Sequence, residues 1–187
     1  PILDDYILFD KALPEVEVQK LILGSLPFKT GDAPVIALRA SFDGMPDALR
    51  ENGAKISANV GVRLEYVPGE QGMAAVVKRW AYDQKASLVY KGIKIQPAGT
   101  MIFLVKPLWS GPAAEHRLAL LKGDTVSLGL ASDDKNKLRL SYRYGKSEAE
   151  LELDKPLPTD RFSKVAVSWD FNKGRIALSG DGDFKET

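Results

Sequence analysis

Short apolar runs recur along almost the whole chain, many with polar residues at alternate positions, and turn-forming residues separate them. A period of two is typical of half-buried strands, and closely spaced strands are typical of a sandwich or barrel. The predicted strands are Tyr6–Phe9, Val35–Phe42, Leu64–Val67, Ser87–Tyr90, Met101–Val105, Leu118–Leu121, Val126–Leu130, Leu138–Tyr144, Ala149–Leu153, Val165–Trp169 and Arg175–Leu178. The pattern therefore predicts an all-β fold, an antiparallel β-sandwich, and not alternating strands and helices.

Two segments have a helical pattern instead. In residues 13–22, Pro and Glu stand in the first turn, and Gly24 follows the last apolar position. The apolar residues on one face of this short helix are Val18, Leu21 and Ile22. Residues 46–51 predict a second, single helical turn that ends at Asn52-Gly53.

The segment Leu138–Leu153 is the clearest predicted hairpin, with Gly145-Lys146 as its turn. Its buried face is predicted to carry Leu138, Leu140, Tyr142, Tyr144, Ala149, Leu151 and Leu153. On the other face, the register predicts three pairs of opposite charge. These are Arg143 with Glu148, Arg139 with Glu152, and Lys137 with Asp154.

Composition excludes several classes of function. The 187 residues are 44% hydrophobic and 27% charged, which suits one globular domain, and the formal net charge is +1. So small a net charge argues against a dedicated polyanion binder, and we expect no nucleic acid partner. No stretch approaches the roughly 18 uninterrupted apolar residues that would span a bilayer, so we also expect no membrane insertion. With no cysteine and one histidine, the chain has no disulfide, no Cys-based zinc site, no thiol nucleophile and no imidazole cluster.

Four segments, in order, resemble motifs of the laminin G-like, concanavalin A-like jelly-roll modules of bacterial extracellular proteins. They are Val35–Gly44 with its Phe-Asp-Gly turn, Tyr66–Ala74 with Pro-Gly and a later Gly, Gly99–Pro107, and Phe162–Asp170. Two positions depart from the family pattern, because Leu104 stands where Trp is usual and Lys164 where His is usual. The resemblance covers roughly residues 35–187 and implies a jelly-roll sandwich.

The family's closing signature comes first here, because Leu3–Val18 resembles an Asp-Asp strand followed by a short helix. Either the chain is part of a tandem array, or residues 1–23 close the sandwich in permuted order; we favour permutation. The predicted organisation is a closing strand and helix at 1–23, a linker at 24–33 and the jelly-roll core at 34–187, all in one structural domain. We therefore expect Tyr6–Phe9 to pair as a strand in the same sandwich that contains Val35–Phe42, with the following helix lying against it.

The resemblance implies a non-catalytic recognition module, for example in adhesion, that binds a glycan or a protein partner. It also implies an extracellular, cell-surface or periplasmic location. Two alternatives remain open at this point. One is a structural or assembly module that self-associates through an open sheet edge. The other is a jelly-roll glycan hydrolase or lyase that uses the acidic strand from Glu148 to Asp154.

Aromatic side chains outside the predicted core are the candidates for ligand binding, because an aromatic face matches the C–H face of a pyranose. Trp80 and Tyr82 lie in a polar stretch, and Trp109 lies between Pro and Gly residues. By contrast, Trp169 alternates in phase with Val165 and Val167, which predicts a core position.

No residue is assigned as catalytic, and we expect the protein not to be an enzyme. The acids of the 148–154 strand are expected to form cross-strand ion pairs, and His116 is expected to be a structural residue at a loop edge. The resemblance implies a structural calcium ion near the Phe-Asp-Gly turn, which points to Asp43, although ordinary turn chemistry also explains this residue.

Overall fold

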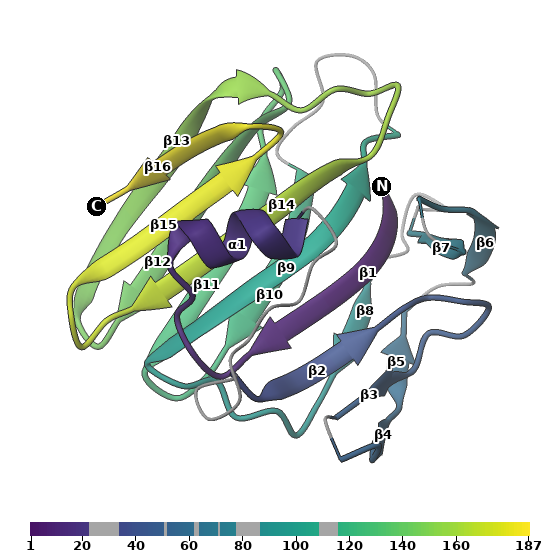
Figure 1. The fold of residues 1–187 in the computed structure, drawn as a ribbon, viewed down its shortest axis with the longest axis horizontal. Helices are drawn as coiled ribbons and strands as arrows, with labels where there is room; N and C mark the ends of the chain where they lie inside the picture. The colour runs from purple at the N-terminus through teal and green to yellow at the C-terminus, as the bar shows by residue number, and fades with distance from the viewer. Residues whose placement is uncertain (23–33, 51, 62–63, 71, 78–86, 109–115) are drawn as a thin grey trace.

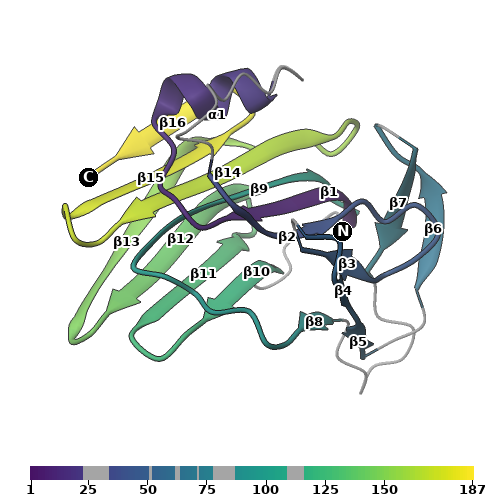
Figure 2. The same cartoon turned by 60° about the horizontal axis from the view of Figure 1, so that its bottom comes forward.

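The computed structural model describes residues 1–22, 34–50, 52–61, 64–70, 72–77, 87–108 and 116–187 (Figure 1). It is an all-β protein in which antiparallel sheets pack face to face as a β-sandwich, as the sequence predicts. The helix α1 (Glu15–Ile22) lies on the outside of the larger sheet (Figure 2). No described helix is long and apolar enough to cross a membrane.

The larger sheet has the strand order β16-β15-β14-β9-β1-β2-β3-β4, and the hairpin β6–β7 joins it through β1. Its strands are β1 (Ile2–Phe9), β2 (Ile36–Ala40), β3 (Ala48–Leu49), β4 (Lys55–Ile56), β6 (Glu65–Pro68), β7 (Met73–Val76), β9 (Ala98–Lys106), β14 (Ser163–Asp170), β15 (Arg175–Gly180) and β16 (Asp183–Glu186). A separate ladder joins β5 (Ala58–Val60) to β8 (Leu88–Tyr90).

Strand β1 is central in the larger sheet. One edge pairs with β9 along most of its length, and the other edge is shared by two partners. Ile2 and Leu3 pair with β7, whereas Tyr6 to Phe9 pair with β2, with Tyr6 opposite Ala40. The prediction that Tyr6–Phe9 forms a strand of the sandwich that contains Val35–Phe42 is therefore confirmed, and the structure adds that the two strands are direct neighbours. The proposed linker at 24–33 lies outside the described residues.

The smaller sheet has the order β10-β11-β12-β13. Its strands are β10 (His116–Lys122), β11 (Val126–Ser132), β12 (Lys137–Tyr144) and β13 (Ser147–Pro156). Tyr144 pairs with Ser147 and Leu140 with Leu151, so the predicted two-residue turn is confirmed. Alternate residues of these strands face the larger sheet, which is why this sheet shows the clearest period of two.

The core lies between the two sheets and consists of the apolar side chains that project inward at alternate positions of the strands in both sheets. Leu138, Leu140, Val165, Val167 and Trp169 are all at most 1% exposed. The predicted core position of Trp169 is confirmed. Tyr142 and Tyr144 are only half-buried, because they pack on Phe171 at the margin of the core, with ring centroids 5.8 and 4.9 Å away.

Helix α1 is fixed to the outer face of the larger sheet by a small apolar cluster. Val18 packs with Phe9, Leu13 and Ala166, as predicted for Val18. The side chains of Leu21 and Ile22, predicted for the same face, lie outside the described residues. The chain that leads into the helix is held by polar contacts with β9 and β14, in which Thr100 takes part.

The predicted second helical turn at 46–51 is wrong, because Ala48–Leu49 form strand β3. Ala48 is fully buried and pairs with Ile56, and Leu49 pairs with Lys55. Asp47 holds this hairpin, since its carboxylate accepts a hydrogen bond from the amide of Ala58 and pairs with Lys55. The burial of Ala48 and the two contacts of the Asp47 carboxylate therefore outweigh the local helical preference.

Candidate functional site

Two aspartates hold the turn that joins β6 to β7. Asp4 on β1 is fully buried, and its Oδ2 accepts a hydrogen bond from the amide of Glu70 at 2.9 Å. Asp43, in the segment after β2, accepts a hydrogen bond from the amide of Met73 at 2.9 Å. One carboxylate thus lies on each side of the turn. This explains two of the acids in the motifs that carry the resemblance.

The two glycines of this turn are required by the same carboxylates. A Cβ on Gly69 would overlap the carboxylate of Asp4, and a Cβ on Gly72 would overlap that of Asp43. Gly72 also has a φ of 85°, which disfavours other residues. The amide of Gly69 donates to the carbonyl of Gly72 at 2.9 Å, which closes the turn.

Asp5 adds a third acid where β1 changes partners from β7 to β2. Its φ of 44° lies in the left-handed region and marks the bulge between the two pairings. Burial raises the pKa of Asp5, the negative charges of Asp4 and Asp43 raise it further, and the Arg39 guanidinium opposes them. The acids therefore share an environment that disfavours charge on Asp5.

This cluster does not by itself make a calcium site. Calcium takes about six to eight oxygen ligands. Among the described residues, no group of three or more acidic or histidine side chains is arranged to hold a metal ion. One oxygen each of Asp4 and Asp43 already accepts a backbone hydrogen bond. Asp43 is explained as a turn clamp, and calcium binding there stays a prediction.

The predicted ligand-binding residues Trp80, Tyr82 and Trp109 lie outside the described residues. The strand ends that lead toward their segments are described, however. Val76 ends β7 and Lys106 ends β9, and both residues pair with Ile2, on its opposite sides. The structure thus brings together the two points from which the chain continues toward these aromatic residues, at the end of β1 that Figure 1 marks with N.

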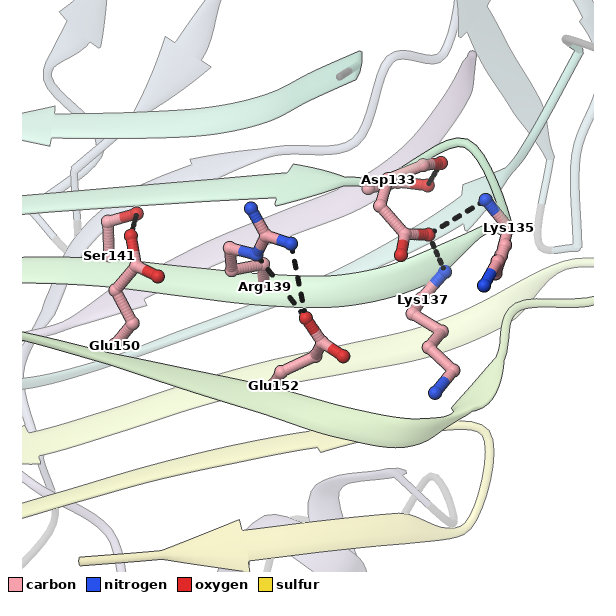
Figure 3. A network of polar contacts seen from close by, with 8 residues as sticks. Asp133, Lys135, Lys137, Arg139, Ser141, Glu150 and Glu152 are labelled. Atoms are coloured by element: carbon pink, nitrogen blue, oxygen red, sulfur yellow. Dashed lines mark hydrogen bonds and ion pairs between the residues drawn. The ribbon is translucent and has the colours of Figure 1, made fainter. Parts of the chain in front are cut away.

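The acids of β13 lie on the outer face of the smaller sheet, opposite basic and polar residues of β12 (Figure 3). Nε and Nη2 of Arg139 donate to Oε2 of Glu152, at 3.4 and 3.3 Å. The hydroxyl of Ser141 donates to Glu150 at 3.3 Å. The predicted registers of Arg139 with Glu152 and of Arg143 with Glu148 are confirmed. Glu152 raises the pKa of Arg139 through this hydrogen bond and its charge.

The predicted pairing of Lys137 with Asp154 is wrong. The register shifts between Lys137 and Arg139, so Lys137 lies opposite Pro156. Asp154 instead pairs with Lys185 of β16 at 2.9 Å. The amides of Asp154 and Lys155 both donate to Asp183, also at 2.9 Å. These contacts join the edges of the two sheets, and a local hairpin register could not anticipate them.

His116 is the first residue of β10, where the sequence predicts a loop edge. It pairs with Ser132 of β11, and burial lowers the pKa of its imidazole. Its position at the start of a half-buried strand agrees with a structural role.

One cavity was not anticipated from the sequence. It has a volume of about 230 Å³ and lies between the start of α1 and strands β14, β15 and β16. Small side chains at alternate positions open it, namely Ala166 and Ser168 on β14 and Ala177 and Ser179 on β15. Two ion pairs border it, Lys173 with Asp170 and Arg175 with Glu186. Alternating small residues are the signal that could have indicated this hollow.

Comparisons with known proteins add no relative. The chain matches no protein-family model, no curated protein and no solved structure.

Proposed function

We propose that this protein is a laminin G-like, concanavalin A-like jelly-roll module that recognises a ligand without catalysing a reaction. In this proposal it is part of an exported or cell-surface bacterial protein. The observation that supports the proposal is that the segments resembling family motifs lie side by side in the larger sheet. Strands β14, β9, β1 and β2 carry four of the five resembling segments, and they are consecutive neighbours in one sheet. The fifth segment forms the β6–β7 hairpin, which pairs with β1.

The position of β1 also supports a permuted order. The strand that resembles the family's closing signature lies between β9 and β2. The Asp4 carboxylate of this strand holds the turn of the Tyr66–Ala74 motif. A closing strand that made no contact with the opening strand would have argued for a tandem array instead.

The proposed ligand is a glycan, with a protein partner as the alternative, and the proposed contacts are Trp80, Tyr82 and Trp109. Their segments continue from β7 and β9 at adjacent positions beside Ile2. A stacked aromatic pair contributes about 0.5–1.5 kcal/mol beyond the area it buries, and we expect a similar contribution from a ring against a sugar.

The test is binding to a glycan array by the parent protein and by two variants. Trp109→Ala should weaken glycan binding by about tenfold, which corresponds to about 1.4 kcal/mol, and should leave the melting temperature nearly unchanged. Tyr142→Ala is the matched control. It removes a half-buried ring beside Phe171, so it should lower the melting temperature but retain binding in the folded protein.

Two outcomes would contradict the proposal. If no glycan and no protein partner binds, and association in sedimentation experiments depends on concentration, the assembly function replaces recognition. If the parent protein turns over β-glucan or polyuronate, it is an enzyme, and the acids of β13 become the residues to change first.

A further inference from the structure

The hollow beside the start of α1 adjoins a second hollow on the same outer face of the larger sheet. The first, of about 230 Å³, lies between α1 and strands β14 to β16 (Figure 2). The second, of about 250 Å³, lies between β9, the start of β14 and the turn that joins β15 to β16. Ser179 of β15 lines both hollows, so they meet at this residue. We call the two hollows together the β15 groove.

The strand register sets the positions along the groove. Ile176 and Leu178 are buried in the core, so the residues between and after them, Ala177 and Ser179, face outward. Ala177 lies opposite Glu186 of β16, and Asp181 follows at the next alternate position after Ser179. Two residues of a strand span about 7 Å. The groove therefore has a first position at Ala177, a middle position at Ser179 and a last position at Asp181, about 7 Å apart.

The middle position holds a hydroxyl in apolar surroundings. Ser179 is 5% exposed, and its hydroxyl forms no hydrogen bond with any residue that the structure describes. Around it, the lining consists of Val18 of α1, Ala166 of β14, Ala177 of β15 and Phe184 of β16. A buried hydroxyl is normally paired, so a ligand that donates a hydrogen bond to Ser179 satisfies a group that the protein leaves open.

The first position has acids on both walls of the groove. Glu15 extends from the start of α1 and Glu186 from β16. Glu186 pairs with Arg175, whereas Glu15 has no ion-pair partner among the described residues. The third acid at this end, Asp170, pairs with a lysine whose side chain is 72% exposed. Three acids and two bases line this hollow, so one negative charge remains.

The last position also has one acid more than it has bases in its lining. The acids are Glu70 and Asp181, and the base is Lys164. Arg161, outside the lining, pairs with Asp181 at 2.8 Å, but its side chain is 62% exposed, so solvent screens this pair. Lys164 forms no ion pair with a described residue and repels a cation that enters. The groove thus has a negative charge at each end and a neutral centre with one free hydroxyl.

We propose that the β15 groove binds a linear polyamine, an aliphatic chain with ammonium groups separated by three or four methylene groups. An extended chain advances about 3.5 Å in three bonds, so its neighbouring nitrogens lie about 5–6 Å apart. That distance is close to the spacing of about 7 Å between the three positions. The terminal ammonium groups lie among the acids of the two ends, and the central one donates to the hydroxyl of Ser179. This site is separate from the proposed glycan contacts and does not depend on them.

The width and the floor of the groove favour a polyamine over a basic protein segment. Strands lie about 4.8 Å apart, so β14 and β16, which flank β15, are separated by about 10 Å. A polypeptide has side chains on both sides of its backbone, together with amides and carbonyls that need partners. Ala166 and Ala177 offer no such partners, whereas methylene groups pack on them without loss of hydrogen bonds.

The experiment is calorimetric titration of the whole chain at low salt, where charge interactions are screened least. The probes are spermidine, octamethylenediamine and octylamine. Octamethylenediamine has nearly the length of spermidine, with a methylene group in place of the central nitrogen, and octylamine keeps one terminal ammonium group. The test variants are Ser179→Ala and Glu15→Gln. The matched control is Glu17→Gln, which makes the same change in the same first turn of α1, at a residue outside the lining.

We expect spermidine to bind most tightly and octylamine most weakly. Ser179→Ala should weaken spermidine about tenfold and leave octamethylenediamine within about twofold, because only spermidine has an ammonium group opposite the hydroxyl. Glu15→Gln should weaken both about fivefold, and Glu17→Gln should change neither by more than about twofold. Lys164→Gln should tighten both, because it removes the opposing cation. Ala177→Leu fills the first hollow and should abolish binding at an unchanged melting temperature.

Four results would overturn this inference. Spermidine does not bind at low salt, or octylamine binds as tightly as spermidine, which indicates a site for a single cation. Ser179→Ala affects spermidine and octamethylenediamine equally, so the hydroxyl does not contact the central ammonium group. Glu15→Gln and Glu17→Gln weaken binding equally, so attraction to the whole surface replaces a site in the groove. None of these results bears on the glycan-array test, so the proposed function stands or fails independently.

Discussion

Thr100 connects the chain before α1 to the larger sheet, and replacing it by valine tests that connection. Thr100 is fully buried on β9. Its Oγ1 accepts a hydrogen bond from the amide of Leu13 at 2.8 Å and donates to the carbonyl of Lys11 at 2.9 Å. The hydroxyl of Ser168 donates to the carbonyl of Leu13 at 2.9 Å. Two hydroxyls thus satisfy three backbone groups that no strand pairs.

Thr100→Val keeps nearly the same shape but removes the hydroxyl, so the amide of Leu13 and the carbonyl of Lys11 lose their partner. A buried polar group left without a hydrogen bond costs about 1–3 kcal/mol. We therefore expect the free energy of unfolding to fall by about 2 kcal/mol. For a chain of this length, that lowers the melting temperature by roughly 4–8 °C. Thr100→Ser keeps the hydroxyl and loses one methyl group, which costs about 1 kcal/mol.

The assay is urea unfolding of the parent and both variants, followed by tryptophan fluorescence, to which the buried Trp169 contributes, together with hydrogen exchange of the Leu13 amide. In the valine variant, this amide should exchange faster than in the parent, whereas the serine variant should retain its protection. A valine variant as stable as the serine variant would refute the reasoning, because removing the hydroxyl and its hydrogen bonds would then cost no more than removing one methyl group.

Two further predictions concern the charges of the smaller sheet and of the joint between the sheets. Glu152→Gln should cost only a few tenths of a kcal/mol in urea unfolding, because its pair with Arg139 has side chains 41% and 40% exposed. The same change should leave β-glucan and polyuronate assays unaltered, whereas loss of a catalytic acid would reduce a measurable rate at least hundreds-fold. The backbone amides of Lys155 and Asp154 hold the pKa of Asp183 below its usual 3.8. Its contribution to stability is therefore present above pH 3.8 and is lost as pH falls through the lowered pKa. Asp183→Asn should accordingly lower the urea midpoint near pH 6 and lower it less at strongly acidic pH. The control Asp134→Asn, at an exposed turn, should change the midpoint little at either pH. Equal losses of the midpoint at both pH values for Asp183→Asn would count against this account.

The sequence alone predicted the elements whose pattern comes from their own neighbours in the chain. The strand alternation of Leu138–Leu153 indicated the four leucines that are buried, whereas Tyr142 and Tyr144 are half-buried and Ala149, predicted for the same face, is exposed. Two of the three predicted charge registers are also confirmed. Val165, Val167 and Trp169 were placed in the core by the same period of two. Local patterns succeed there because a half-buried strand must alternate, whatever it packs against.

Tertiary structure decided the features that depend on segments distant in the chain. Residues 46–51 have a helical composition, yet pairing with Ile56 makes β3. Asp154 does not pair with Lys137 as predicted, because β16, about thirty residues later in the chain, lies beside it. Lys185 of β16 forms the ion pair with the Asp154 side chain, and Asp183 accepts a hydrogen bond from the Asp154 amide. The role of Asp43 as a clamp on Met73 required β2 and the β6–β7 turn to meet. Such contacts follow from which strands become neighbours, and that depends on burial summed over the whole sandwich rather than on any single segment.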